Sequence, residues 1–248
     1  MTTDAVLPTT VELYSDIHCP WAYLALFRLR QVWPEYQDRV RLSFRALSLE
    51  LKNKRPTPKP ILDVEFDLMK EQEPGLPIQR WQAPEYLFVP TFLPAFEAEK
   101  AAEQQGEEAG WEFAWQVRLA FFDKSRTVCM RNELKRVARD AGLDAEQFLI
   151  DWDSGRFRRE VIAESYHGWE ELKVEGSPTF LLPSGKQVHN PGAMRVKLDR
   201  NGQVTDKQPA DCPDGDCLQP YRAMLDEAIG LAGESERDVS NLQDVPSD

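Results

Sequence analysis

Residues 16–22 read DIHCPWA and place a cysteine between two predicted elements. The short apolar run before them, residues 11–14, is typical of a β-strand, and residues 21–32 after it form an apolar-faced segment typical of an α-helix. The N–H groups and positive dipole end of a helix favour a thiolate, so we expect Cys19 to be nucleophilic with a lowered pKa. Pro20 suits the first helical turn, where a missing N–H costs nothing.

Ala22 stands where a dithiol redox pair would carry its second cysteine, three residues after Cys19. A two-cysteine cycle is therefore not expected at this motif, and one thiol remains. His18 could stabilise a thiolate if it were protonated, with a solvated loop histidine as the alternative. Trp21 could line a substrate groove, with packing in the core as the alternative.

The composition restricts the partners and the location of the protein. The chain has 248 residues, 42% of them hydrophobic, and a formal net charge of −12. This charge argues against nucleic acid or an anionic membrane as the main partner. We expect no transmembrane helix, because there is no run of about 18 apolar residues. Residues 1–8 lack the features of a secretory signal, so we expect a cytoplasmic protein.

The order of predicted elements indicates the fold class. Residues 40–47 favour a second strand, parallel to the first. The proline-rich residues 48–94 predict a long surface segment that is ordered only in part. Helices are expected over residues 95–106, 111–122, 132–141, 144–154 and 156–172. Strands are expected over residues 178–182 and 187–189, followed by a hairpin with its turn at Asn201-Gly202 and by a closing helix at 220–231.

This order is the connectivity of an α/β, thioredoxin-like fold with an inserted all-helical domain. We expect the thioredoxin-like domain to be discontinuous and to comprise residues 9–62 and 166–232. Residues 63–165 are expected to form the helical insertion with its proline-rich lead-in. Residues 233–248 are polar and acidic and are expected to form a flexible tail.

Two motifs together resemble the DsbA family of thiol–disulfide oxidoreductases. The first is Asp16-x-x-Cys19-Pro20-Trp21, and the second is the segment 174–180, which reads VEGSPTF. The resemblance covers about residues 9–232. The chain is most similar to the FrnE-like cytoplasmic branch, which also shares the His189-Asn190-Pro191 segment. The resemblance implies a thiol–disulfide oxidoreductase or isomerase.

The resemblance also implies the roles of individual residues. The Ser177–Pro178 peptide bond is expected to be cis, which turns the Ser177 backbone toward Cys19. An extended peptide or glutathione would pair with that backbone by strand addition. The expected catalytic residues are Cys19 and Pro178, and the expected substrate-binding residues are Ser177, Trp21, Pro20 and His18. An ordinary trans proline at the start of a strand is the alternative.

Cys212 and Cys217 form a candidate second redox pair. They flank a Pro-Asp-Gly turn and could close a small disulfide ring. A similar pair occurs in some FrnE-like proteins, which implies a redox or regulatory role; a local staple or two free thiols are the alternatives. No metal site is expected, because two cysteines without clear histidine partners suit zinc poorly. Cys129 is expected to lie in the core.

Three functions are consistent with the sequence. The first is a DsbA/FrnE-like oxidoreductase or isomerase that acts through the single nucleophile Cys19 and a cis-proline substrate clamp. The second is a glutathione-dependent isomerase or transferase, similar to the kappa-class transferases and hydroxychromene-carboxylate isomerases, which Ala22 favours. The third is a redox-inactive peptide-binding module. We expect no cofactor except glutathione as a co-substrate, protein thiols or disulfides as partners, and a monomer or homodimer.

Overall fold

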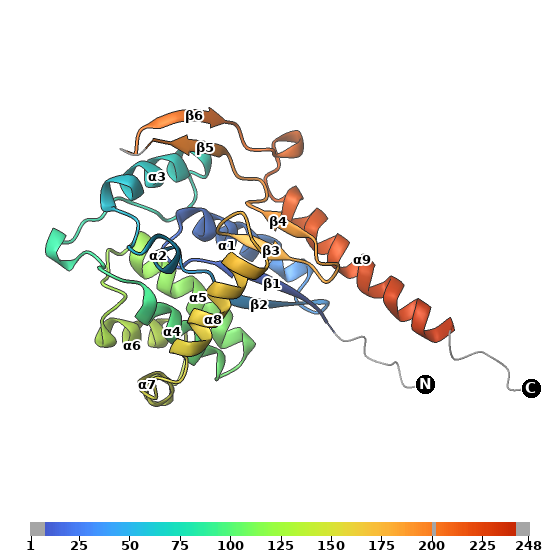
Figure 1. Cartoon of the computed structure of the whole chain (residues 1–248), viewed down its shortest axis with the longest axis horizontal. Helices are drawn as coiled ribbons and strands as arrows, with labels where there is room; N and C mark the ends of the chain where they lie inside the picture. Colours follow the sequence, from blue (N-terminus) through green and yellow to red (C-terminus); the bar gives the residue numbers. More distant parts are fainter. Residues whose placement is uncertain (1–7, 200–201, 242–248) are drawn as a thin grey trace, which may run out of the picture.

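The computed structural model describes residues 8–199 and 202–241, the side chains of 231–241 excepted (Figure 1). Its main sheet has four strands in the order β2-β1-β3-β4. They are β1 (Thr9–Ser15), β2 (Val40–Ala46), β3 (Thr179–Leu181) and β4 (Gln187–His189). β1 and β2 are parallel, β3 runs antiparallel to β1, and β4 antiparallel to β3. The predicted thioredoxin-like fold class is confirmed.

Helices fill the segment between β2 and β3. The α-helices of the described chain are α1 (Pro20–Val32), α2 (Leu49–Asn53), α3 (Lys59–Gln72), α4 (Leu93–Glu103), α5 (Glu107–Phe122), α6 (Arg131–Asp140), α7 (Ala145–Asp153), α8 (Arg158–Tyr166) and α9 (Gln219–Asn241). Four short helical segments accompany them: η1 (Trp33–Glu35), η2 (Glu85–Leu87), η3 (His167–Glu171) and η4 (Pro213–Gly215).

Two large hydrophobic cores meet at α1. One core joins β1, α1 and α9, with Leu13, Leu29 and Leu225 fully or almost fully buried. The other fills the helical insertion and includes Tyr23 and Leu24 of α1. Helix α1 is therefore held from both sides, so its N-terminus, where Cys19 lies, has a fixed position relative to the insertion.

Residues 48–94, predicted to be ordered only in part, contain α2, α3 and η2, and the length of α3 was not foreseen. Pro58 is the N-cap of this helix and Pro60 lies in its first turn, where proline is well tolerated. Pro74 follows its end. The prolines therefore mark the limits of α3 instead of breaking it, and the expected domain boundary after residue 62 falls inside this helix.

The C-terminal part of the chain carries a second, separate sheet. It is the hairpin of β5 (Arg195–Leu198) and β6 (Val204–Gln208), which lies beside α3 (Figure 1). The expected Asn201-Gly202 turn falls partly on residues 200–201, which are outside the described residues. Helix α9 continues through the first part of the expected tail, and residues 242–248 are outside the described residues.

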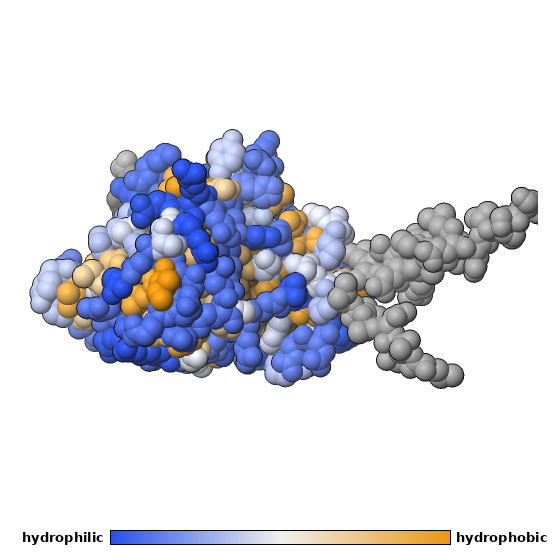
Figure 2. Space-filling model, turned by 90° about the horizontal axis from the view of Figure 1, so that it is seen from below, coloured by the Kyte–Doolittle hydropathy of each residue, from blue (hydrophilic) through white to orange (hydrophobic). Residues whose placement is uncertain are grey.

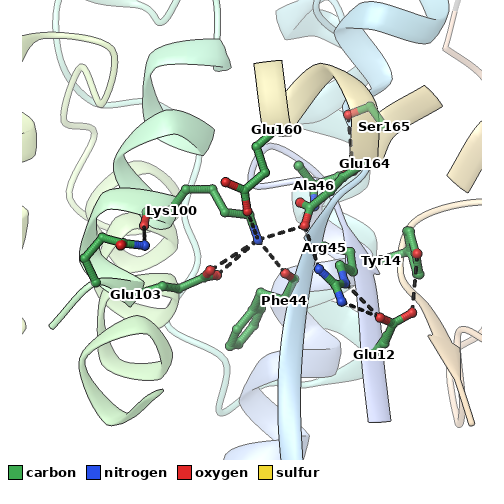
Figure 3. A network of polar contacts seen from close by, with 11 residues as sticks. Glu12, Tyr14, Phe44, Arg45, Ala46, Lys100, Glu103, Glu160, Glu164 and Ser165 are labelled. Carbon is green, nitrogen blue, oxygen red and sulfur yellow. Dashed lines mark hydrogen bonds and ion pairs between the residues drawn. The ribbon is translucent and has the colours of Figure 1, made fainter. Parts of the chain in front are cut away.

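A buried ionic network ties the insertion to the sheet (Figure 3). Lys100 on α4 is 3% exposed and pairs with Glu164 on α8 at 3.1 Å and with Glu103 at 3.3 Å. Its ammonium also donates to the Phe44 carbonyl of β2 at 2.7 Å. Arg45 on β2 binds Glu164 from the other side. Burial raises the pKa of Glu103 to about 7, although Lys100 acts in the opposite direction.

One face of the molecule is largely polar. The face in Figure 2 is mainly hydrophilic, and its apolar side chains lie in small separate patches. Among the described residues, none of the helices has the length and apolar character needed to cross a membrane.

The first prediction concerns Lys100. Replacing it by methionine leaves Glu103 and Glu164 without their buried cation, so Lys100→Met should lower the free energy of unfolding by about 3 kcal/mol. Lys186→Met, which breaks the exposed pair with Glu227, is the control and should cost less than about 1 kcal/mol. Urea unfolding measures both variants, and equal losses would contradict a special role for the buried network.

Candidate active site

Cys19 lies at the N-cap of α1 and faces the segment before β3. Its backbone is extended, with φ −85° and ψ 118°, and Pro20 follows as the first helical residue. The thiol donates a hydrogen bond to the Ser177 carbonyl, with Sγ and O 3.3 Å apart. The peptide bond between Ser177 and Pro178 is cis, the geometry that the resemblance implies. Residues far apart in the sequence thus meet at one sulfur atom.

Asp16 fixes the loop that carries the cysteine. Its carboxylate accepts the N–H of His18 at 2.7 Å and the N–H of Leu49 at 2.6 Å. Its own N–H donates to the Ser177 hydroxyl at 2.8 Å. Burial raises the pKa of Asp16 to about 6, while the hydrogen bonds from His18 and Leu49 act against this shift. Asp16 therefore connects the DIHCPWA loop to both neighbouring strand ends.

The expectation of a lowered Cys19 pKa is wrong. The side chain is only 5% exposed, and burial raises the pKa of Cys19 to about 12. The negative charges of Glu65 and Asp16 contribute to the increase, whereas the backbone N–H of Ala22 and a hydrogen bond with the Ser177 side chain act in the opposite direction. The resting site therefore holds a neutral thiol, because removal from water outweighs the helix N-terminus.

Glu65 is a functional candidate that sequence reasoning missed. It lies on α3, and its carboxylate accepts the indole N–H of Trp21 at 3.3 Å. Burial raises the pKa of Glu65 to about 7, and the hydrogen bond from Trp21 acts against this shift. The negative charge of Glu65 acts on the Cys19 thiol, and a carboxyl group that titrates near neutrality is suited to exchange protons. The prolines around α3 hide its helical pattern, so the sequence gives no signal for Glu65.

His18 lies in an apolar pocket and is not a cation next to the Cys19 sulfur. It is 1% exposed and its ring stacks on Phe92 with 4.1 Å between centroids. Neither ring nitrogen has a hydrogen-bond partner within the described part of the chain. Burial lowers the pKa of His18 to about 3. The suggested stabilisation of a thiolate by protonated His18 is therefore contradicted.

A groove of about 1220 Å³ lies beside the motif. Trp21 lines it and is half-buried, as the substrate-groove alternative requires. Glu175, just before the cis-proline segment, and the turn at residues 190–194 form further parts of the wall. The rim includes Asp211, next to Cys212. Pro20 is buried in the first turn of α1, and neither it nor Cys19, Ser177 or Pro178 lines this groove, so Trp21 is the residue of the motif that joins the groove to the thiol.

The candidate second pair is oxidised. Cys212 and Cys217 form a disulfide with their Cα atoms 4.4 Å apart. The Cys212 sulfur lies 3.5 Å from the Gly192 carbonyl, in the turn that borders the groove. Cys129 is a free, half-buried thiol packed against the helical core. Among the described residues, no group of three or more His, Cys, Asp or Glu side chains is placed to hold a metal ion.

Comparison with known proteins decides the family. The chain matches the DSBA-like thioredoxin domain over residues 10–199. It belongs to this family. No curated protein sequence matches the chain. Relative to the usual pair of cysteines, this DSBA-like chain departs at Ala22, which is buried in α1.

Solved structures share the fold of this DSBA-like chain at low sequence identity. A putative protein disulfide isomerase from Nitrosomonas europaea is 16% identical with a TM-score of 0.59, covering 89% of this chain and 99% of that one. The cytosolic disulfide reductase DsbM from Pseudomonas aeruginosa is 18% identical (TM-score 0.57; 92% and 98% covered). A 2-hydroxychromene-2-carboxylate isomerase is also 18% identical (TM-score 0.54; 93% and 98% covered). These similarities show the fold alone.

The second prediction tests the charge of Glu65. Glu65→Gln keeps an oxygen that accepts from Trp21 but removes the negative charge, so the pKa of Cys19 should fall and its alkylation at pH 8 should become about threefold to tenfold faster. Glu71→Gln on the same helix alters an exposed residue paired with Lys207 and should leave the rate unchanged. Iodoacetamide labelling followed by mass mapping of Cys19 gives both rates. A rate in Glu65→Gln equal to that of the unaltered protein would show that Glu65 does not act on the thiol.

The third prediction follows from the burial of neutral His18. Its pKa is about 3 in the folded protein and about 6.5 when unfolded, so below pH 6.5 only the unfolded chain takes up the proton. His18 therefore costs stability as the pH falls. The unfolding free energy of His18→Leu relative to the unaltered protein should rise by about 2 kcal/mol between pH 7 and pH 5. His167→Leu, at a histidine whose side chain is 45% exposed and contacts Glu171, serves as control, and a pH-independent difference for His18→Leu would refute this account.

Proposed function

We propose that this chain catalyses thiol–disulfide exchange through Cys19 as its single nucleophile. The observation that carries the proposal is the contact between the Cys19 thiol and the Ser177 carbonyl beside a cis-proline bond. It places the sulfur next to a backbone segment that precedes a short strand, so an extended substrate can pair with that segment while its disulfide meets the thiol. Family membership supports the reaction class.

The proposed reaction begins with removal of the Cys19 proton, for which Glu65 is the suited acceptor. The thiolate attacks one sulfur of a substrate disulfide, the sulfur–sulfur bond breaks, and the departing thiolate takes up a proton. This leaves a mixed disulfide between Cys19 and the substrate. Position 22 is alanine, so a second thiol, proposed to be that of glutathione, attacks the substrate sulfur of the mixed disulfide. A glutathione–substrate disulfide forms, the bond to Cys19 breaks, and the departing Cys19 thiolate takes up the proton that glutathione lost.

Glutathione and protein disulfides are the proposed substrates, and the groove beside Trp21 is the proposed binding site. One structure of DsbM is described as a complex with GSH. Cys212 and Cys217 are bonded to each other, so in this state they offer no thiol for release of the mixed disulfide. A cytoplasmic location remains our expectation from the sequence.

A second candidate is a glutathione-dependent isomerase of small organic molecules. The observations in its favour are Ala22 and the neutral, buried Cys19 thiol, which suit binding of glutathione without a covalent step. The two functions differ in whether a disulfide forms at Cys19, and this difference can be measured directly.

The fourth prediction tests the covalent step. The reduced protein incubated with oxidised glutathione should gain one glutathione at Cys19, faster as the pH rises toward about 9 because the thiolate is the nucleophile. Cys19→Ser should abolish the adduct, whereas Cys129→Ser should retain it. Reduced glutathione should then remove the adduct. Intact-mass spectrometry follows each step. Glutathione binding without an adduct would move the assignment to the isomerase, and neither binding nor adduct would favour the redox-inactive module.

A further inference from the structure

The half-buried His189 belongs to a hydrogen-bond chain that ends at the cis-proline segment. Thr179 on β3 and His189 on β4 are direct cross-strand neighbours. The Thr179 hydroxyl lies 2.7 Å from the Gly176 carbonyl and 3.1 Å from Nδ1 of His189. The Asn190 side-chain nitrogen lies 3.2 Å from Nε2 of the same ring. Every polar atom of the imidazole therefore has a partner.

The partners fix the direction of each hydrogen bond. The Gly176 carbonyl only accepts, so the Thr179 hydroxyl must donate its single proton to it. The hydroxyl oxygen can then only accept from His189, and Nδ1 must carry a proton. Nε2 accepts from the Asn190 amide in the neutral ring. The chain thus runs in one direction, from Asn190 through His189 and Thr179 to Gly176.

The same ring also fills the space over Gly176. A Cβ atom at position 176 would lie 2.9 Å from Cε1 of His189, so only glycine allows this contact. The N–H of Asn190 additionally donates to the Pro178 carbonyl at 3.2 Å. The His189-Asn190 pair therefore holds the segment 176–178 at both of its ends. Ser177, whose carbonyl accepts the Cys19 thiol, lies between these two points.

We propose that His189 is a positioning residue, which through Thr179 and Gly176 holds the Ser177 carbonyl against the Cys19 thiol. The inference rests on the proposed function, because it concerns the same nucleophile. A carbonyl that accepts from Cys19 favours the thiol over the thiolate. The hydrogen-bond relay from Asn190 through His189 and Thr179 to Gly176 therefore has two effects. It holds an acceptor for the proton of the resting Cys19 thiol, and it keeps the Ser177 backbone in place for an extended substrate.

The fifth prediction is that a change at His189 moves two rates of Cys19 in opposite directions, which a general loss of folded structure would not do. In a Cys129→Ser background, His189→Leu should make alkylation of Cys19 by iodoacetamide about tenfold faster, since one hydrogen bond that favours the thiol is weakened. Exchange with a disulfide-containing peptide should become slower, because the Ser177 backbone is no longer fixed. His189→Asn retains a donor at the place of Nδ1 and should restore both rates to within about threefold of the unaltered protein. His167→Leu is the matched surface control.

The alkylation rate of Cys19 tests the role of His189, and the disulfide-exchange rate tests the proposed function, so the two can fail separately. If the unaltered protein is alkylated at Cys19 but exchanges no disulfide, the proposed function fails, and the alkylation rates still test the relay. If His189→Leu is alkylated at the unaltered rate, the relay does not position Ser177. Should His189→Leu not fold, two-bond ¹H–¹⁵N spectra of the unaltered protein report the tautomer of His189 directly. A ring protonated at Nε2 alone would overturn the inference.

Discussion

The hydrogen bond from the Cys19 thiol to the Ser177 carbonyl is the contact on which the site depends, because it joins two segments that are 158 residues apart in the chain. Asp16 strengthens this junction from the other side by donating its N–H to the Ser177 hydroxyl. Both segments are themselves anchored, one at the end of β1 and the other at the start of β3, which are neighbours in the sheet. The pairing of β1 with β3 thus brings the Cys19 sulfur to Ser177, and helix α1 fixes the sulfur relative to the insertion.

Magnitudes explain why the thiol is neutral although it lies at a helix N-terminus. Interaction of a charge with a helix end is worth about 0.3–1 kcal/mol. Burial and the neighbouring carboxylates raise the pKa of Cys19 from 9.0 to about 12, which corresponds to roughly 4 kcal/mol at 1.36 kcal/mol per pKa unit. The desolvation cost therefore exceeds the dipole effect. A reactive thiolate in this protein requires a change at the site, such as neutralisation of Glu65 or displacement of the Ser177 carbonyl by a substrate.

The fold could be predicted because its signals are local. The β-α-β pattern, the glycine-serine-proline segment and the apolar helices each identify one element, and their order specifies the sheet. The chemistry of the site could not be predicted in the same way, because pKa values depend on burial and on partners distant in the sequence. Glu65 acts on Cys19 from α3, a helix that the prolines around it concealed. His18 looked solvent-accessible beside the cysteine, but Phe92 from the proline-rich segment covers it.

The helical insertion is therefore part of the active site as well as its support. The thioredoxin-like part supplies the Cys19 thiol and the cis-proline segment, whereas the chain between β2 and β3 supplies Glu65 and the Phe92 ring that stacks on His18. Lys100 and its carboxylates hold this insertion against β2 and α8. Since the charge of Glu65 in the insertion acts on Cys19, changes within the insertion can alter the reactivity of the thiol without any change in the DIHCPWA motif. A motif of this kind predicts where the sulfur lies, and residues of the insertion contribute to how readily the sulfur reacts.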